Sequence, residues 1–257
     1  MSAPPAAGSA VVKDVKARRL VLFDVDGTLL SAGPSARTAF QTALEDVFGT
    51  SGDIDGYAFE GRLDPLIVTD LMRAAGVPDA TIALRRGDAL ALYLDRLEAS
   101  LRTRAPVLKP GVLQLLDALE KVPGLVPALL TGNVERGARV KLSAAGLWHR
   151  FVFGVWGDEA ACREELGPIA LEKARPATGL AFTGSECVVV GAQITDALLR
   201  FAGRERYLSA LEAGPRAVVS LYLGVMKGKR VPELSKAARR ALEERAPERK
   251  PEKPDKP

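Results

Sequence analysis

The chain has little histidine and little cysteine. His149 is the only histidine among 257 residues, so catalytic triads that depend on histidine and metal sites built from several histidines are excluded. Cys162 and Cys187 are the only cysteines and follow no spacing pattern, which excludes a disulfide framework and a zinc site. Because free cysteines suit a reducing compartment, we expect a cytoplasmic protein in which both are packing residues.

Long apolar runs are also lacking. No run approaches the roughly 18 residues of a membrane span, so no membrane partner is expected. Residues 1–17 contain small residues and prolines, but they begin with neither a basic segment nor an apolar one. We expect this segment to be a flexible tail and not a signal peptide.

The net charge of +4 is concentrated in residues 227–257, which contain eleven Lys/Arg and six Asp/Glu. The rest of the chain therefore has a net charge of −1. This segment is also Pro-rich and almost without apolar residues after Leu242, so we expect a disordered tail. No aromatic residue is interleaved with its charges, and we therefore expect no nucleic-acid partner.

The segment Leu20–Leu30, L-V-L-F-D-V-D-G-T-L-L, carries the first candidate site residues. An apolar run bounded by turn formers is typical of a buried parallel strand, and ligands bind where such strands end. Asp24 and Asp26 are two residues apart, so a strand would direct both side chains the same way. A strand that simply ends in a D-G turn is the alternative interpretation.

The complete string resembles motif I, D-x-D-G-T, of the haloacid dehalogenase-like (HAD) superfamily. This resemblance implies an α/β fold, with a Rossmann-like parallel sheet core and a small inserted all-helical cap domain. It also implies that Asp24 is a nucleophile and Asp26 a general acid/base. The core is expected to be discontinuous, formed by residues 18–34 and 105–226, with the cap at residues 35–104.

The cap segment shows helical periodicity and no strand-like run. Helices are expected from Ser35 or Pro34 to Phe48, near Pro65–Ala75 and near Pro78–Leu101. Such a cap would close over the site and exclude water. The resemblance to phosphoglycolate phosphatase-like caps with G-[KR]-x-D makes Arg62 in G-R-L-D-P a candidate for binding substrate. The alternative is a surface arginine that precedes a helix with Asp64 as its N-cap.

A second α/β segment follows Lys109-Pro110-Gly111. A helix is expected at Val112–Lys121, and then a strand through L-V-P-A-L-L that ends in T-G-N. In this order after D-x-D-G-T, the T-G-N string resembles motif II of the family. The resemblance implies that Thr131 binds phosphate, supported by the Gly132 backbone N–H and by Asn133.

The segment F-V-F-G-V-W-G-D-E-A predicts a short strand in which Phe151, Val152 and Phe153 belong to the core. A helix is expected after it, at Pro168–Thr178. Family motif III is one Lys or Arg before or within this helix, which helps to neutralise the phosphoryl group. By its spacing to Pro168, Arg163 is the candidate, and Lys173 is the alternative. Either residue could instead be a solvated surface cation.

The last motif departs from the family pattern. A strand is expected at Cys187–Val190, and the family then has G-D-x-x-x-D where this chain reads G-A-Q-I-T-D. Asp196 is present, as a possible supporting metal ligand, but Ala192 replaces the first aspartate. Native divergence and a damaged coding region after Gly191 both remain open. Arg216–Leu221 is expected to form the last strand.

The resemblance therefore implies an Mg²⁺-dependent phosphomonoester hydrolase that acts on a small phosphorylated metabolite through an aspartyl-phosphate. Mg²⁺ would be bound by the Asp24 carboxylate and the Asp26 backbone carbonyl, and Ala192 is expected to weaken this binding. The alternative is a weak or inactive HAD-like domain that binds a phosphorylated ligand or a protein. Dehalogenation is disfavoured because it does not need Asp26. The substrate's identity and the oligomeric state are left open.

Overall fold

The computed structural model describes residues 18–191, and a four-stranded parallel sheet lies at the centre of this part of the chain. Its strand order is β5-β4-β1-β6. The strands are β1 (Arg19–Phe23), β4 (Leu125–Leu130), β5 (Gly154–Val155) and β6 (Cys187–Val190). All three strand pairs are parallel, so the carboxyl ends of the strands meet at one edge of the sheet.

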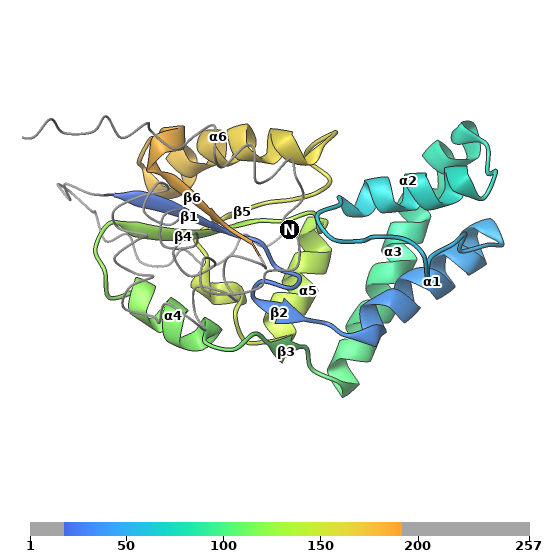
Figure 1. Cartoon of the computed structure of the whole chain (residues 1–257), viewed down its shortest axis with the longest axis horizontal. Coiled ribbons are helices and arrows are strands. Elements are labelled where there is room, and N and C mark those ends of the chain that lie inside the picture. Colours follow the sequence, from blue (N-terminus) through green and yellow to red (C-terminus); the bar gives the residue numbers. More distant parts are fainter. Residues whose placement is uncertain (1–17, 192–257) are drawn as a thin grey trace, which may run out of the picture.

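Helices cover both faces of the sheet (Figure 1). Helix α6 (Leu166–Thr178) lies on one face, and α4 (Val112–Leu119) and α5 (Glu135–Ala144) lie on the other. The side chains of β1 alternate between the two layers. Leu20 and Leu22 belong to the apolar cluster under α6, whereas Val21 and Phe23 belong to the cluster under α4 and α5. A strand buried on both faces explains the continuous apolar run in the sequence.

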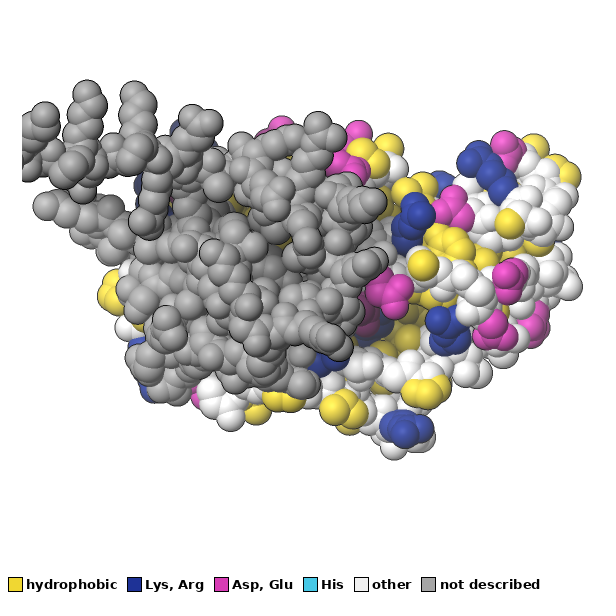
Figure 2. Space-filling model, in the orientation of Figure 1, with side chains coloured by type: hydrophobic (Ala, Val, Ile, Leu, Met, Phe, Trp, Pro, Cys, Tyr) yellow, Lys and Arg dark blue, Asp and Glu magenta, His cyan; other side chains and the backbone are white. Residues whose placement is uncertain are grey.

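Three further helices form a separate unit beside the sheet (Figure 1). They are α1 (Pro34–Phe48), α2 (Asp64–Ala74) and α3 (Asp79–Thr103). Their apolar faces pack into a cluster of their own, which includes Phe40, Leu44, Met72 and Leu97. In the space-filling view, Lys/Arg and Asp/Glu side chains are interspersed over the surface of this unit (Figure 2).

The chain leaves the α/β core and returns to it at one place. Strand β2 (Leu30–Ser31) precedes α1, and β3 (Val107–Leu108) follows α3. The two strands pair antiparallel, with Leu30 beside Leu108 and Ser31 beside Val107. The two segments that link the helical unit to the core are therefore adjacent in space.

Three expectations about local structure were wrong in detail. Val152 is 38% exposed and does not belong to the core, because β5 begins only at Gly154; Phe151 is buried as expected. Helix α6 starts at Leu166, earlier than Pro168, because the turn η2 (Arg163–Glu165) leads directly into it. Asp64 is not the N-cap of α2, whose N-cap is Leu63.

Several predictions lie outside the described residues. These are the two tails at residues 1–17 and 227–257, the last strand at Arg216–Leu221, and the motif that contains Ala192 and Asp196. None of the helices in residues 18–191 combines the length and the apolar character that crossing a bilayer needs.

Candidate active site

A tight turn after β1 places Asp24 and Asp26 at the carboxyl edge of the sheet. Asp24 directly follows Phe23, the last residue of the strand. Gly27 has a φ of 75°, a left-handed conformation that favours glycine, and its N–H donates to the Leu30 carbonyl at 2.8 Å. The D-G pair of the motif therefore reverses the chain immediately beyond the two carboxylates.

Asp24 is mostly buried and faces one cation. Its Oδ2 lies 3.1 Å from Nη2 of Arg163, and its Oδ1 accepts a hydrogen bond from the Val25 N–H at 2.9 Å. Burial raises the pKa of Asp24 above its ordinary value, although the Arg163 guanidinium opposes this shift. A carboxylate in this setting is stabilised by any additional positive charge.

Asp26 is held by two side chains from the next α/β unit. Nζ of Lys141 and Nδ2 of Asn133 both donate to Asp26 Oδ2, at 2.6 and 2.7 Å. Lys141 also donates to Oδ1 of Asn133 at 2.5 Å. Burial by itself would lower the pKa of Lys141, but Asp26, with Tyr93 and Asp64, raises it above the ordinary value. Lys141 is therefore a buried ammonium.

The T-G-N loop follows β4 and lies beside this pair. The Thr131 hydroxyl is buried and accepts hydrogen bonds from the backbone N–H and the side-chain amide of Asn133, at 3.2 and 3.3 Å. Gly132 packs against the helical unit so closely that a Cβ there would be 1.9 Å from the carbonyl oxygen of Arg62. Only glycine permits this approach of two backbones.

Asp64 connects the helical unit to the core. Its N–H donates to the Gly132 carbonyl at 2.8 Å, and its Oδ2 accepts a hydrogen bond from the N–H of Val134, the N-cap residue of α5, at 3.1 Å. Asp64 thus accepts a hydrogen bond from an otherwise unpaired N–H at the N-terminus of a core helix, and it does not cap its own helix. Burial raises its pKa to about 6, although Lys141 and the Val134 N–H act in the opposite direction.

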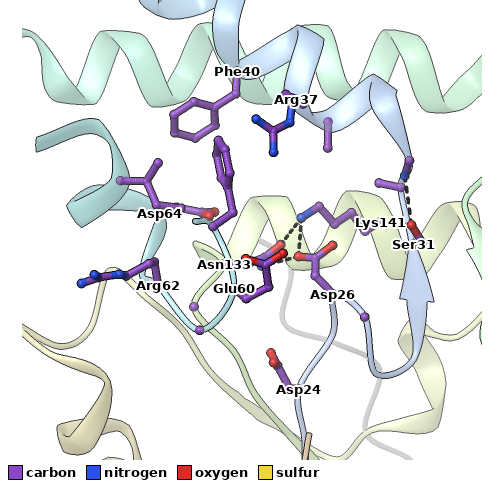
Figure 3. Close-up of a pocket in the computed structure, with 18 of the residues that line it drawn as sticks. Asp24, Asp26, Ser31, Arg37, Phe40, Glu60, Arg62, Asp64, Asn133 and Lys141 are labelled. Atoms are coloured by element: carbon purple, nitrogen blue, oxygen red, sulfur yellow. Dashed lines mark hydrogen bonds and ion pairs between the residues drawn. The ribbon is translucent and has the colours of Figure 1, made fainter. Parts of the chain in front are cut away.

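A cavity of about 640 Å³ lies between the helical unit and the carboxyl edge of the sheet. Asp24, Asp26, Asn133 and Lys141 line its core side (Figure 3). The helical unit contributes an aromatic and charged wall, whose members include Arg37, Phe40, Phe59, Glu60, Arg62 and Tyr93. The two sides together enclose a site that is acidic at its base and has cations around it.

The structure brings most of the predicted site residues together. Of the two candidate cations, Arg163 contacts Asp24. The Lys173 ammonium instead donates to the Gly154 carbonyl at 3.1 Å and pairs with Glu159. Arg62 lines the cavity, but its side chain extends away from Asp24 and Asp26 in Figure 3.

The sequence interpretation missed Lys141. A signal was present in the helical spacing, because Val134, Ala138, Lys141 and Leu142 share the buried face of the segment that begins α5. A lysine on an apolar helix face requires a buried partner, and that partner is Asp26. Asp64 was likewise interpreted only as a local cap.

Comparisons with known proteins agree with this geometry. The family model of the haloacid dehalogenase-like hydrolases matches residues 18–199. The phosphoglycolate phosphatase of Xylella fastidiosa (strain 9a5c) is 32% identical over 189 residues, which cover 69% of this chain and 73% of that protein. The probable phosphatase IndB of Dickeya dadantii (strain 3937) is 30% identical over 171 residues, covering 60% of this chain and 66% of that protein.

A solved structure shows the same fold. The CbbY protein of Rhodobacter sphaeroides, in complex with xylulose-(1,5)-bisphosphate, superposes with a TM-score of 0.54 at 20% identity. The match covers 67% of this chain and 76% of that protein. The extent of the family match, the two curated relatives and the strand-end acidic pair lead to one conclusion: the chain belongs to the haloacid dehalogenase-like hydrolase family, among its phosphatases.

Proposed function

We propose that the protein is an Mg²⁺-dependent phosphomonoester hydrolase that forms an aspartyl-phosphate on Asp24. The observation that supports this proposal most is the position of Asp24. Its carboxylate lies at the end of β1 and lines the cavity, with the Arg163 guanidinium 3.1 Å away. A buried nucleophile next to a fixed cation is suited to a reaction that transfers a dianionic group.

In the first step, a carboxylate oxygen of Asp24 attacks phosphorus, and the bond from phosphorus to the ester oxygen breaks. Asp26 gives its proton to that leaving oxygen, so that an alcohol departs. In the second step, water attacks the phosphorus of the aspartyl-phosphate and gives a proton to Asp26. The bond to Asp24 breaks, and inorganic phosphate and the starting protonation of Asp26 are restored.

The phosphoryl oxygens would be held by the T-G-N loop and by Arg163. Thr131 and the Gly132 N–H belong to the loop that follows β4, so they lie at the same sheet edge as Asp24. The Asn133 side chain is already bonded to Asp26 and Lys141. We therefore propose that Asn133 supports the phosphate site through Asp26 and through Thr131.

The acidic pair fits a magnesium ion. Mg²⁺ prefers oxygen ligands and is commonly bound by one or two carboxylates, with waters and substrate phosphate completing the shell. Within residues 18–191, no group of three His, Cys, Asp or Glu is arranged to hold a metal. The proposed ligands are the Asp24 carboxylate and the Asp26 backbone carbonyl, as the resemblance to motif I implies. Bound Mg²⁺ would offset the charge between nucleophile and phosphate. Asp196, the possible supporting ligand, lies outside the described residues.

The helical unit is proposed to act as a cap that selects a small phosphorylated metabolite. Its wall combines the Arg37 guanidinium with the rings of Phe40 and Phe59, next to a cavity of about 640 Å³. One curated relative is a phosphoglycolate phosphatase, and the CbbY structure contains a sugar bisphosphate. Phosphorylated organic acids and sugars are therefore the first substrates to test. Because both cysteines of the chain are free, we propose the cytoplasm as its location.

The direct test is hydrolysis of p-nitrophenyl phosphate with and without Mg²⁺ by the wild type, Asp24→Asn and Ala192→Asp. We expect slow wild-type turnover, which Asp24→Asn abolishes and Ala192→Asp accelerates at lower Mg²⁺ concentration. Wild-type activity no higher than that of Asp24→Asn would refute the proposal that the protein is a phosphomonoester hydrolase. If Ala192→Asp leaves the Mg²⁺ dependence unchanged, Ala192 does not occupy the metal-ligand position.

Ala192 favours a second candidate function. With the first aspartate of the last motif replaced, the domain could bind a phosphorylated ligand or a protein without turning it over. Isothermal titration with inorganic phosphate, combined with the turnover assay, separates the two functions. Binding by a wild-type protein that shows no turnover would support this alternative.

A further inference from the structure

Lys141 is a buried cation to which the proposed reaction assigns no role. Its side chain is 4% exposed, and it lies on α5 beside the fully buried Ala138 and Leu142. Burial of an ammonium group is unfavourable unless acceptors surround it. A lysine at this position therefore depends on its partners, and those partners line the cavity.

The partners form a closed ring of three side chains (Figure 3). Lys141 donates to Asp26 and to Asn133, and Asn133 donates to Asp26. Lysine can only donate, so Asn133 must present its oxygen to Lys141 and its amide nitrogen to Asp26. The ring therefore has one consistent direction for every hydrogen bond.

Both donors converge on the same oxygen of Asp26. Oδ2 accepts from Lys141 Nζ at 2.6 Å and from Asn133 Nδ2 at 2.7 Å, whereas Oδ1 has no hydrogen-bond partner within residues 18–191. An oxygen with two such donors remains an acceptor whether the carboxyl group is neutral or ionised. The proton that Asp26 carries must then be on Oδ1.

We propose that Lys141 is a positioning residue for Asp26, which it holds so that Oδ1 delivers the proton to the leaving oxygen of the substrate. This inference rests on the proposed function, in which Asp26 is the general acid/base. When the proton moves from Oδ1 to the ester oxygen, a carboxylate forms beside the Lys141 ammonium. Lys141 thereby stabilises charge that develops during the transfer.

A purely structural role for Lys141 predicts a different pattern of rates. Loss of stability or a disturbed cavity would slow all substrates by the same factor. Loss of proton transfer slows poor leaving groups much more than good ones, because a stable phenolate can depart without a proton. The dependence of the rate on the leaving group therefore distinguishes the two roles.

The experiment compares kcat/KM for aryl phosphates from p-nitrophenyl phosphate to phenyl phosphate. This parameter includes the transfer to Asp24 and not the later hydrolysis. We expect Lys141→Met to lower kcat/KM for phenyl phosphate by about 100-fold or more, and for p-nitrophenyl phosphate by less than about 10-fold. The control is Arg150→Met, which removes another mostly buried cation, paired with Asp117 and Glu120 away from the cavity. We expect the control to lower both rates by the same factor.

Equal losses on both substrates with Lys141→Met would overturn the inference. If this variant does not fold, Lys141→Gln is measured instead, since it retains a donor without the charge, and the same criterion applies. Asp26→Asn tests the underlying assignment separately. If Asp26→Asn shows no leaving-group dependence, the acid/base role itself fails. If Asp26→Asn shows it and Lys141→Met does not, only the role of Lys141 fails.

Discussion

The carboxylate of Asp64 accepts a hydrogen bond from the N–H of Val134, 3.1 Å away and 70 residues later in the chain. The bond joins the first turn of α2 to the N-terminus of α5. Because Asp64 is buried, its pKa is raised from 3.8 to about 6. We therefore expect the strength of this contact between the helical unit and the core to depend on pH.

An acid with a raised pKa in the folded state binds its proton more tightly when folded. The resulting contribution to the free energy of unfolding is present at low pH, and about 3 kcal/mol of it is lost as the pH rises from about 4 to about 6. Asp64→Asn, which is neutral at every pH, should lack this decrease. Urea unfolding of both proteins at several pH values measures the difference, and parallel curves would contradict it.

Arg163 and Lys173 offer a matched pair of cations for a test of phosphate binding. Arg163→Met removes the guanidinium next to Asp24 and should lower kcat/KM by about 100- to 1000-fold, because a positioned donor to the transferring group is lost. Lys173→Met removes a cation bonded to Glu159 and Gly154, and it should lower the rate less than about 10-fold. Steady-state kinetics that rank the two variants in the opposite order would exclude Arg163 as the phosphate ligand.

Gly132→Ala should disrupt the contact between the T-G-N loop and the helical unit. The new Cβ would be 1.9 Å from the Arg62 carbonyl, so the two backbones must separate. We expect a loss of about 1–3 kcal/mol in unfolding free energy and a large loss of activity. The control is Gly87→Ala in α3, where nothing lies within 4 Å of the added Cβ. It should stabilise the protein by about 0.5–1 kcal/mol.

The core of the helical unit can be tested with two leucines of α3. Leu97 is fully buried, so Leu97→Ala should cost about 2–5 kcal/mol of unfolding free energy. Leu84 is 81% exposed, and Leu84→Ala should change the unfolding free energy by less than about 0.5 kcal/mol. Thermal melts of the two variants give the comparison. Similar losses in both would mean that α3 does not pack as described.

The order of strands and helices could be predicted from the sequence because each site segment follows an apolar strand. Asp24 and Thr131 are the first residues after β1 and β4, and the parallel pairing of these strands brings them to one edge. That relationship needs only the pattern of apolar residues and the rule that ligands bind where parallel strands end.

Lys141 and Asp64 could not be assigned in the same way because their partners are distant in the sequence. Lys141 contacts Asp26 across 115 residues, and Asp64 contacts Val134 across 70. The helical spacing places Lys141 on an apolar face but does not identify its partner, and a local pattern treats an aspartate before a proline as a cap. Val152 was misplaced for a related reason, since the point at which β5 joins β4 depends on packing and not on local hydrophobicity.

The antiparallel pair of β2 and β3 bears on which insertions between these two strands evolution can accept. Leu30 of β2 pairs with Leu108 of β3, so this two-stranded sheet requires only that the two ends of the intervening segment be adjacent. The free energy of closing such a loop grows slowly with its length. Replacement of residues 32–106 by a segment of another size would therefore preserve the pairing of β2 with β3. It would also remove Asp64, so any replacement must supply a new acceptor for the Val134 N–H at the start of α5.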